Sequence, residues 1–246
     1  MVITQGYLLG GRIRYSQPAH GFRSGIEPVL LAASVACHPN ELILEAGTGA
    51  GAALLCLSAR IPGIRAVGVE RDAPTASLAA TNAQANGLEN IEIITGDIEA
   101  TTFEGHFDHA IANPPYHSPS GSASPVPARE TAKRGSNRVM QTWISQLGAA
   151  LRDRGSLTLI VPAGMIPACL LAMDQTRCPC TVVFPLWPKF GRPAKLVLLR
   201  GVKTGRTPMR LMPGLILHQA DGSFTERAQS LLTGGAALNL DHADDA

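Results

Sequence analysis

The sequence has few charged residues (16%), very few aromatic residues (4%) and no long hydrophobic run. The apolar stretches Val29–Cys37 and Ile166–Met173 are about half as long as the roughly 20 residues that a membrane-spanning helix needs. The first residues contain no basic segment followed by an apolar one, which argues against a secretory signal. We therefore expect a cytoplasmic protein with no membrane contact.

Cysteine is scarce, and its spacing does not match a metal site. Cys37, Cys56 and Cys169 lie in apolar, helix-like stretches, and a single proline separates Cys178 from Cys180. Structural metal sites use C-x-x-C pairs or nearby histidines, and neither arrangement occurs here. We predict no metal ion and reduced thiols, as expected in a reducing compartment.

Short apolar runs alternate with helical patterns from about residue 41 to 202. The predicted strands are bounded by Gly, Pro, Asn or Asp; they are Glu41–Ala46, Arg65–Glu70, Asn90–Thr95, Phe107–Asn113, Gly155–Val161, Cys180–Leu186 and Lys195–Gly201. The predicted helices are Ala52–Ile61, Ala73–Asn86, Asn137–Arg152 and Gly164–Thr176. This alternation predicts an α/β fold, with an open, largely parallel sheet covered by helices on both faces.

The segment before this core has its own pattern. Residues 6–23 predict a hairpin, and Ile26–Cys37 predicts an amphipathic helix. We expect residues 1–40 to form a hairpin and helix that pack on the main domain of residues 41–235.

The C-terminal part and one internal segment differ again. Residues 208–232 predict a strand pair closed by Asp221-Gly222 and then a short helix over Glu226–Leu232. We expect residues 236–246 to form a disordered tail. Ser118–Pro127, rich in Ser, Gly and Pro, predicts a mobile loop without helix or strand.

A glycine-rich turn follows the first strand of the core, between Glu45 and Gly51. Gly47 and Gly49 allow a tight turn and let a ligand approach the backbone at a helix N-terminus. The G-x-G-x-G spacing differs from the G-x-G-x-x-G of dinucleotide folds, and no Gly-Lys-Ser/Thr follows, which excludes a P-loop. The turn predicts a small-molecule site, with a plain tight turn as the alternative.

Acidic residues end the next two strands. Glu70 can accept hydrogen bonds from both hydroxyls of a ribose, as NAD enzymes also do, or it is a solvated charge before Arg71. Asp97 can accept a bond from an adenine amino group while the Ile98 N–H faces a ring nitrogen; alternatively, Asp97 is only an N-cap.

Asn113-Pro114-Pro115-Tyr116 ends the fourth strand and carries the most specific signal. The two prolines fix φ and remove two N–H donors, so the carbonyls of Asn113 and Pro114 are held in an extended turn. The Asn113 amide oxygen and a neighbouring carbonyl then give two acceptors for one amino group. Tyr116 offers a face on which a planar group can stack. A simple proline-rich turn is the alternative.

Basic residues are unevenly distributed, although the net charge is only +2. Between residues 175 and 220 there are eight basic residues and no acidic one, and a second cluster surrounds Glu130. Such clusters are typical of a surface that binds a polyanion, and equally of a solubilising surface.

Taken in order, these motifs resemble those of class I S-adenosylmethionine-dependent methyltransferases that act on amino groups. Flanking segments are further similar to bacterial tRNA (adenine-N6)-methyltransferases that modify valine tRNA beside the anticodon. These segments are Leu9–Pro18, Gly21–Leu31, Ala128–Glu130, Pro193–Lys195 and Asp221–Thr225. The resemblance implies a seven-stranded, Rossmann-like sheet and S-adenosyl-L-methionine as cofactor.

The resemblance also implies roles for individual residues. The implied cofactor-binding residues are Glu45, Gly47, Gly49, Glu70, Arg71, Asp97, Ile98 and Asn113. Residues 17–31 are expected across the methionine end of the cofactor, with Arg23, Ser24 or Glu27 near its charged groups, or they only anchor the first helix. The implied RNA contacts are Arg129, Lys133, Arg134, Lys189, Arg192 and Lys195.

The implied catalytic residues are Asn113, Pro114 and Tyr116. If the Asn113 side chain and the Pro114 carbonyl accept the N–H bonds of an adenine amine, its nitrogen becomes more electron-rich. The reaction then depends on positioning and needs no general base. Tyr116 would stack on the target base, which must leave its own stack to reach the site.

Four other functions remain open. A glutamine methyltransferase acting on release factors uses the same Asn-Pro-Pro-Tyr, although such chains carry a long helical N-terminal domain. Guanine-N2 methylation of rRNA is usual in longer or duplicated chains. A catalytically silent RNA-binding module does not require two acceptors facing one amine. An NAD oxidoreductase accounts for neither the glycine spacing nor Asn113–Tyr116.

Overall fold

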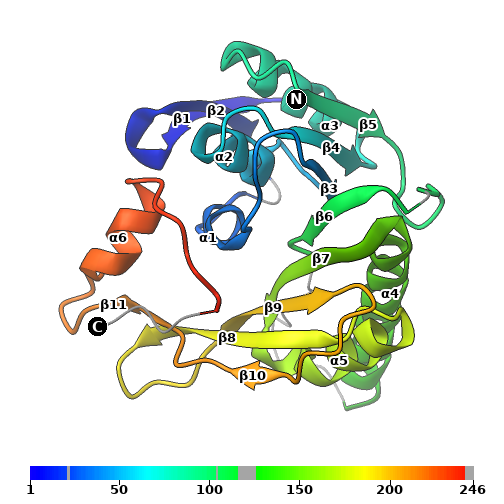
Figure 1. Ribbon diagram of the computed structural model, residues 1–246. Helices are drawn as coiled ribbons and strands as arrows, with labels where there is room; N and C mark the ends of the chain where they lie inside the picture. The colour runs from blue at the N-terminus through cyan, green and yellow to red at the C-terminus, as the bar shows by residue number, and fades with distance from the viewer. Residues whose placement is uncertain (21–22, 104, 116–125, 242–246) are drawn as a thin grey trace.

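The computed structural model describes residues 1–20, 23–103, 105–115 and 126–241, and Figure 1 shows how its elements are arranged. The main sheet has nine strands in the order β10-β8-β9-β7-β6-β3-β4-β5, with β11 also paired to β8. Its strands are β3 (Leu42–Ala46), β4 (Arg65–Glu70), β5 (Ile91–Thr95), β6 (Phe107–Ala112), β7 (Leu151–Pro162), β8 (Cys180–Lys189), β9 (Leu196–Val202), β10 (Arg210–Leu211) and β11 (Leu215–His218). The helices are α1 (Glu27–Ser34), α2 (Ala52–Arg60), α3 (Ala73–Ala85), α4 (Val126–Ala150), α5 (Ile166–Gln175) and α6 (Glu226–Leu232).

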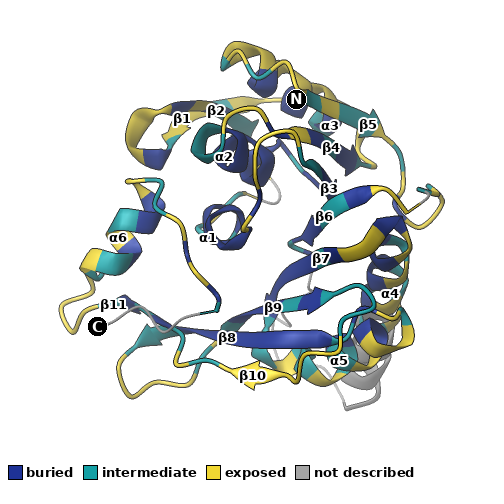
Figure 2. Ribbon diagram, in the orientation of Figure 1, coloured by how far each residue is buried: buried dark blue, intermediate teal, exposed yellow. Residues whose placement is uncertain are grey.

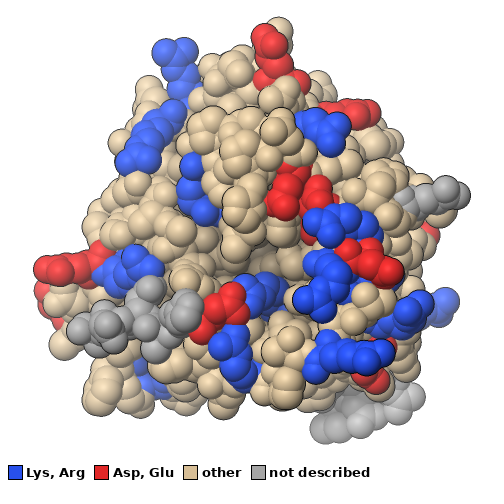
Figure 3. Space-filling model, in the orientation of Figure 1, with Lys and Arg blue, Asp and Glu red and all other residues tan. Residues whose placement is uncertain are grey.

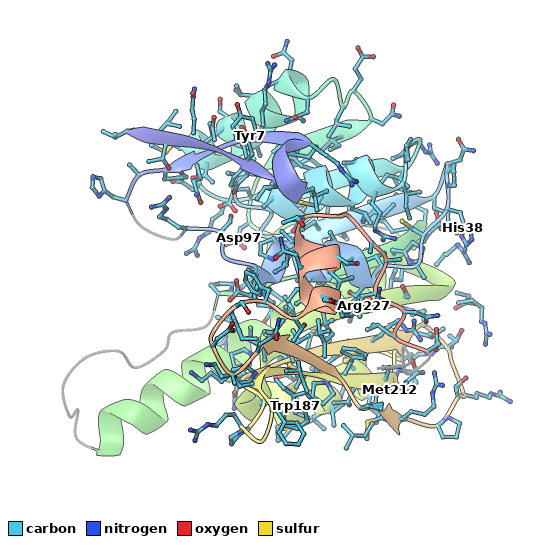
Figure 4. All side chains as sticks on the ribbon, turned by 90° about the vertical axis from the view of Figure 1, so that its left-hand side faces the viewer. Tyr7, His38, Asp97, Trp187, Met212 and Arg227 are labelled. Carbon is cyan, nitrogen blue, oxygen red and sulfur yellow. The ribbon has the colours of Figure 1, made fainter. Side chains whose placement is uncertain are left out.

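The strand directions define two edges of this sheet. Strands β3 to β7 are parallel, so their C-terminal ends share one edge, which we call the carboxyl edge; the opposite one is the amino edge. Strand β9 is antiparallel to β7 and β8, and its first residue, Leu196, pairs with Pro162 at the end of β7. The loop of residues 190–195 therefore also lies at the carboxyl edge. In Figure 4, Asp97 marks the carboxyl edge and His38 marks the amino edge.

Helices cover both faces of the sheet, which confirms the predicted α/β architecture. In β3, Ile43 belongs to the buried cluster that includes α1, α2 and α6, whereas Leu44 belongs to the cluster that includes α4 and α5. Successive strand residues point to opposite faces, so a strand covered on both sides is apolar throughout. Figure 2 shows this burial along the central strands. No helix in the described part of the chain is long and apolar enough to cross a membrane.

A hairpin formed by β1 (Ile3–Leu8) and β2 (Ile13–Pro18) packs on α3. The Asn82 side chain accepts from the Ser16 N–H (3.0 Å) and donates to the Ser16 carbonyl (2.8 Å). The Asn86 side chain does the same with Arg14, at 2.9 and 2.8 Å. Asn82 also donates to the Ala50 carbonyl (2.9 Å), so one amide connects the hairpin to the glycine turn.

Most predicted core elements are confirmed to within a few residues, and Arg65–Glu70 and Glu226–Leu232 have the predicted bounds. The expectation of an amphipathic helix over Ile26–Cys37 was wrong. Helix α1 is shorter, and every residue from Pro28 to Ser34 is buried. Contacts with α2 and α6 enclose this helix, and that enclosure requires an apolar surface on nearly every side.

Helix α4 begins at Val126 and not at Asn137, so the last two residues of the loop expected over Ser118–Pro127 are helical. Residues 116–125 lie outside the described part. Proline is tolerated in the first turn of a helix, and the Ala, Arg, Glu and Lys residues after Pro127 are strong helix formers. These early turns are polar and lack the apolar period that the prediction relied on.

The C-terminal region differs from the expected strand pair and loose tail. Strands β10 and β11 each pair with β8, and the turn at Asp221-Gly222 closes only a bridge between His218 and Phe224. Within residues 236–241, Leu238 and Leu240 are buried, and the Leu238 N–H donates to Ala33 (2.8 Å). Asp241 forms ion pairs with the guanidinium groups of Arg200 (2.6 Å) and Arg210 (2.5 Å). Apolar burial and paired charge hold this segment in place.

Candidate active site

A cavity of about 950 Å³ opens at the carboxyl edge, between the ends of β3 to β6 and the β1–β2 hairpin. All eight residues predicted to bind the cofactor line this cavity: Glu45, Gly47, Gly49, Glu70, Arg71, Asp97, Ile98 and Asn113. They come from four separate strand ends, which the parallel sheet brings to one place. Open α/β sheets bind their ligands at this edge.

The glycine turn has two positions with different requirements. Gly47 has φ +64°, and a Cβ added there meets the Trp143 ring carbon Cη2 at 2.5 Å. Gly49 has φ +56°, and an added Cβ meets nothing within 4 Å. Gly47 is thus needed because an indole packs on it. Gly49 presents bare backbone to open space in the cavity, which suits close approach of a ligand.

Glu45 is a buried carboxyl on the wall of the cavity (3% exposed). Burial raises its pKa from 4.5 to about 8, and the nearby Glu70 carboxylate contributes to the increase. The Thr48 hydroxyl donates a hydrogen bond to it at 2.5 Å. A carboxyl in this state takes on a negative charge when a cationic group approaches.

The Glu70 carboxylate accepts hydrogen bonds from the N–H groups of Gly49 (3.0 Å) and Asp72 (2.9 Å). It therefore positions the glycine turn and still has lone pairs for a ligand. Asp97 is exposed and accepts a hydrogen bond from the Glu99 N–H (2.9 Å). This bond is the kind that an N-cap residue makes, so the alternative role of Asp97 as an N-cap also fits the structure. Ile98 is buried and supplies an apolar wall.

Asn113 follows β6 directly, and β6 is fixed between β3 and β7. The Asn113 side chain is half-buried, lines the cavity and makes no hydrogen bond to another described residue. Pro114 is buried and Pro115 is exposed at the cavity rim. Tyr116 lies outside the described residues. Two prolines thus hold a free amide at the mouth of the cavity.

The sequence motifs missed several residues of this site. Trp143 and Val139 of α4 line the cavity, but a helix residue facing a ligand has the same spacing as one facing the core. Tyr15 also lines it; its hydroxyl lies 2.7 Å from the Ser24 hydroxyl, and burial raises its pKa to about 12.

Part of the segment 17–31 reaches the site. Gln17, Pro18, His20, Ser24 and Pro28 line the cavity, whereas Arg23 and Glu27 are not among its lining residues. Of the three polar candidates only Ser24 lies on the wall, and the contact of this segment with the methionine end of the cofactor stays a prediction.

The predicted RNA-contacting residues occupy two segments. Lys189, Arg192 and Lys195 flank the β8–β9 loop at the carboxyl edge. Arg129, Lys133 and Arg134 lie on the first turns of α4, which extend from the same side of the molecule in Figure 4. Other basic residues are elsewhere: Arg177 and Lys203 lie at the amino edge. Figure 3 shows basic side chains over both halves of the face that it draws, interspersed with acidic ones.

In the described residues no group of three or more His, Cys, Asp or Glu side chains is arranged to hold a metal ion, and all five cysteines are buried free thiols. The sequence pattern of the family described as methyltransferase small domain matches residues 28–166, more than half of the chain, and includes the strand ends around the cavity. The chain belongs to the methyltransferase small domain family. As a member of this family it is an S-adenosyl-L-methionine-dependent methyltransferase.

Two curated relatives of this methyltransferase have different acceptors. A tRNA1(Val) (adenine(37)-N6)-methyltransferase of Actinobacillus pleuropneumoniae serotype 5b (strain L20) is 26% identical over 215 residues, 86% of this chain and 89% of the relative. The release factor glutamine methyltransferase of Escherichia coli (strain K12) is 36% identical over 74 residues, 30% of this chain and 27% of the relative. The first match spans the flanks as well as the core.

A solved structure described as a predicted O-methyltransferase from Agrobacterium tumefaciens has the same fold. It superposes with a TM-score of 0.73 at 24% identity and covers 87% of this chain and 98% of its own. The likeness extends over the α/β sheet and supports the fold alone.

Proposed function

We propose that this methyltransferase methylates an exocyclic amino group, and that the acceptor is adenine N6 in tRNA. The observation that carries the proposal is the position of Asn113, whose free amide opens on the cavity that the glycine turn and Glu70 also line. The relative that matches 86% of the chain is a tRNA adenine-N6 methyltransferase, which favours adenine as the group that bears the amine.

The residues around the cavity fit S-adenosyl-L-methionine. Gly49 leaves space for a ligand to lie on the backbone. Glu70 retains lone pairs for ribose hydroxyls, and the exposed Asp97 beside the Ile98 wall suits an adenine. Glu45, with its raised pKa, suits the ammonium group of the methionine part. When bound, the cofactor supplies an electrophilic methyl group on a sulfonium centre.

Asn113 and Pro114 orient the acceptor amine. The Asn113 side-chain oxygen and the Pro114 carbonyl accept the two N–H bonds, which makes the nitrogen more electron-rich and points its lone pair at the cavity. The prolines keep both acceptors in place without a donor of their own that would compete. Removing one preorganised hydrogen-bond partner of this kind typically costs on the order of 10²–10³ in rate. Tyr116 is proposed to stack on the base.

The acceptor is proposed to be RNA because cations border the site. Lys189, Arg192 and Lys195 lie at the same edge as Asn113, and no acidic residue occurs between positions 175 and 220. The first turns of α4 add Arg129, Lys133 and Arg134. Phosphate contacts of this kind produce binding that weakens steeply with salt.

One experiment tests both the role of Asn113 in methylating an amine and the choice of tRNA as the acceptor. The purified protein is given labelled S-adenosyl-L-methionine with total tRNA, total rRNA and a protein fraction in parallel, and we expect label in tRNA as N6-methyladenine. Asn113→Ala should lose transfer on the order of 100-fold or more while binding the cofactor within severalfold by calorimetry. Asn90→Ala, which removes an exposed amide before β5, is the matched control.

Three outcomes contradict the proposal. Label confined to protein would favour the glutamine function, and label in rRNA as methylguanine would favour guanine N2. Wild-type turnover by Asn113→Ala would show that methyl transfer does not depend on the Asn113 side chain as a hydrogen-bond acceptor for the amine.

A further inference from the structure

Phe190 is the most exposed of the large apolar side chains in the described residues, at 88%. Burying a phenylalanine is worth roughly 1.5–3 kcal/mol, so a fully exposed one contributes nothing to folding of the chain that carries it. The fold as described gives this side chain no partner. Its position at the carboxyl edge, where the cavity also opens, suggests that a partner comes from outside.

The backbone around Phe190 is fixed. The Arg192 N–H donates to the Lys189 carbonyl (3.2 Å) and closes a turn in which Gly191 has φ +68°. A residue with positive φ at the third position is characteristic of a type II turn, and the second position, here Phe190, forms its corner. The side chain therefore projects from a defined corner of the chain.

Both ends of this loop are also held. The Lys195 carbonyl accepts from the Ala163 N–H (2.9 Å), just after β7. The Lys189 ammonium donates to the Ala220 carbonyl (3.0 Å), just after β11. A held turn loses little entropy when it binds a partner, so contacts made by Phe190 are not offset by ordering of the loop.

The turn lies at the same edge of the sheet as the candidate active site. Strand β6, which ends just before Asn113, is separated from β9 only by β7. Two strand spacings amount to about 10 Å. Ala112 pairs with Leu159 of β7, which pairs with Leu199 of β9. Leu196, the first residue of β9, lies three residues further out, or about another 10 Å. Phe190, just beyond the end of β8, thus lies several nucleotide lengths from Asn113 along the carboxyl edge.

Cationic residues also flank Phe190 in the sequence. Lys189 precedes it, Arg192 follows after Gly191, and Lys195 ends the loop. An exposed aromatic face between cations is the combination that single-stranded nucleic acid binds: the ring stacks on a base and the cations contact the flanking phosphates.

We propose that Phe190 stacks on an unpaired nucleobase of the RNA several nucleotides from the target, while Arg192 and Lys195 bind its backbone. The inference rests on RNA being the substrate and adds that a single-stranded segment lies near the target. Stacking does not read the base identity strongly, so Phe190 contributes affinity and placement, not sequence recognition.

The test is binding of a short unstructured oligoribonucleotide with one adenine among pyrimidines, measured by fluorescence anisotropy. Phe190→Ala should weaken binding roughly 5- to 100-fold, because base–aromatic stacking is worth about that factor. Phe190→Trp should restore it. Arg192→Ala should reduce the salt slope of log Kd by about one, whereas Phe190→Ala leaves the slope unchanged.

Leu211→Ala is the matched control, since it removes another exposed apolar side chain (73%) near the start of β8, away from the carboxyl edge. Equal binding by wild type and Phe190→Ala overturns the inference, whatever the enzyme methylates. Loss of oligonucleotide binding with Phe190→Ala in a protein that methylates no RNA supports the surface and overturns the proposed function. Concentration-dependent dimerisation lost in Phe190→Ala, without oligonucleotide binding by the wild type, overturns the inference, while label transfer to tRNA still decides the proposed function.

Discussion

Asn82 joins three parts of the molecule that no backbone ladder connects. Its amide is buried (3% exposed) and makes hydrogen bonds to both backbone groups of Ser16 and to the Ala50 carbonyl. Asn82→Ala removes all three bonds and leaves a cavity between α3, β2 and the glycine turn. We predict that this substitution lowers both stability and cofactor affinity.

The size of the effect follows from the bonds lost. At about 0.5–1.5 kcal/mol each, three hydrogen bonds give roughly 2–4 kcal/mol of unfolding free energy. That is a large part of the 5–15 kcal/mol typical of a whole domain. The Ala50 carbonyl loses its amide donor, so the glycine turn is less ordered, and we expect the Kd for the cofactor to rise about tenfold.

Asn86→Ala separates the two effects. Its amide makes the same pair of bonds to Arg14 and one to the Asn82 carbonyl, but it is half-buried and does not reach the glycine turn. Water can replace its bonds, so we expect a loss of about 1 kcal/mol and an unchanged cofactor Kd. Urea unfolding and titration calorimetry on both variants give the two numbers. Equal cofactor Kd values for wild type and Asn82→Ala, or equal Kd changes in the two variants, would refute the reasoning.

Three further predictions follow from the site. Gly47→Ala should destabilise the protein by about 1–3 kcal/mol in thermal unfolding, because the new methyl overlaps Trp143, and pairing it with Trp143→Leu should recover part of that loss. Gly49→Asp should abolish cofactor binding by calorimetry with a smaller effect on unfolding, since the position faces open space; unchanged binding would exclude the glycine turn as the cofactor site. The raised Glu45 pKa means that the folded protein keeps a proton that the unfolded chain loses above pH 4.5, so the stability of the ligand-free protein should fall as pH rises from about 4.5 to about 8 and then level off. Glu45→Gln should remove that slope in urea unfolding, and a slope that persists in this variant would assign it to other groups.

The sheet was predictable because its strands are short apolar runs with clear ends. Ile43 and Leu44 are adjacent, both fully buried, and on opposite faces, which is what an uninterrupted apolar run in a covered strand indicates. The strand-end residues Glu45, Glu70, Asp97 and Asn113 converge because parallel strands end at one edge. Local patterns are therefore enough to predict that these residues share one cavity.

The parts that sequence reasoning missed depend on contacts distant in the chain. Trp143 lies on a helix whose apolar spacing does not distinguish a core residue from one that packs on Gly47. Leu238 and Leu240 are single apolar residues in a polar tail, and only the surfaces of α1 and the sheet make their burial favourable. The early turns of α4 have helical propensity but no period.

The bond between the Leu238 N–H and the Ala33 carbonyl joins two segments that lie far apart in the sequence. Helix α1 contacts α6 and is enclosed by residues made much later, yet Pro28 at its start lines the cavity. Contacts between residues so far apart in sequence form late, because the intervening loop must first be closed. On the ribosome, this wall of the cavity is completed only after residues 236–241 have emerged. The nascent protein therefore acquires the full cavity long after the strands that end around it have been made, and deleting residues 236–241 would alter a cavity lined by residues of the first half of the sequence.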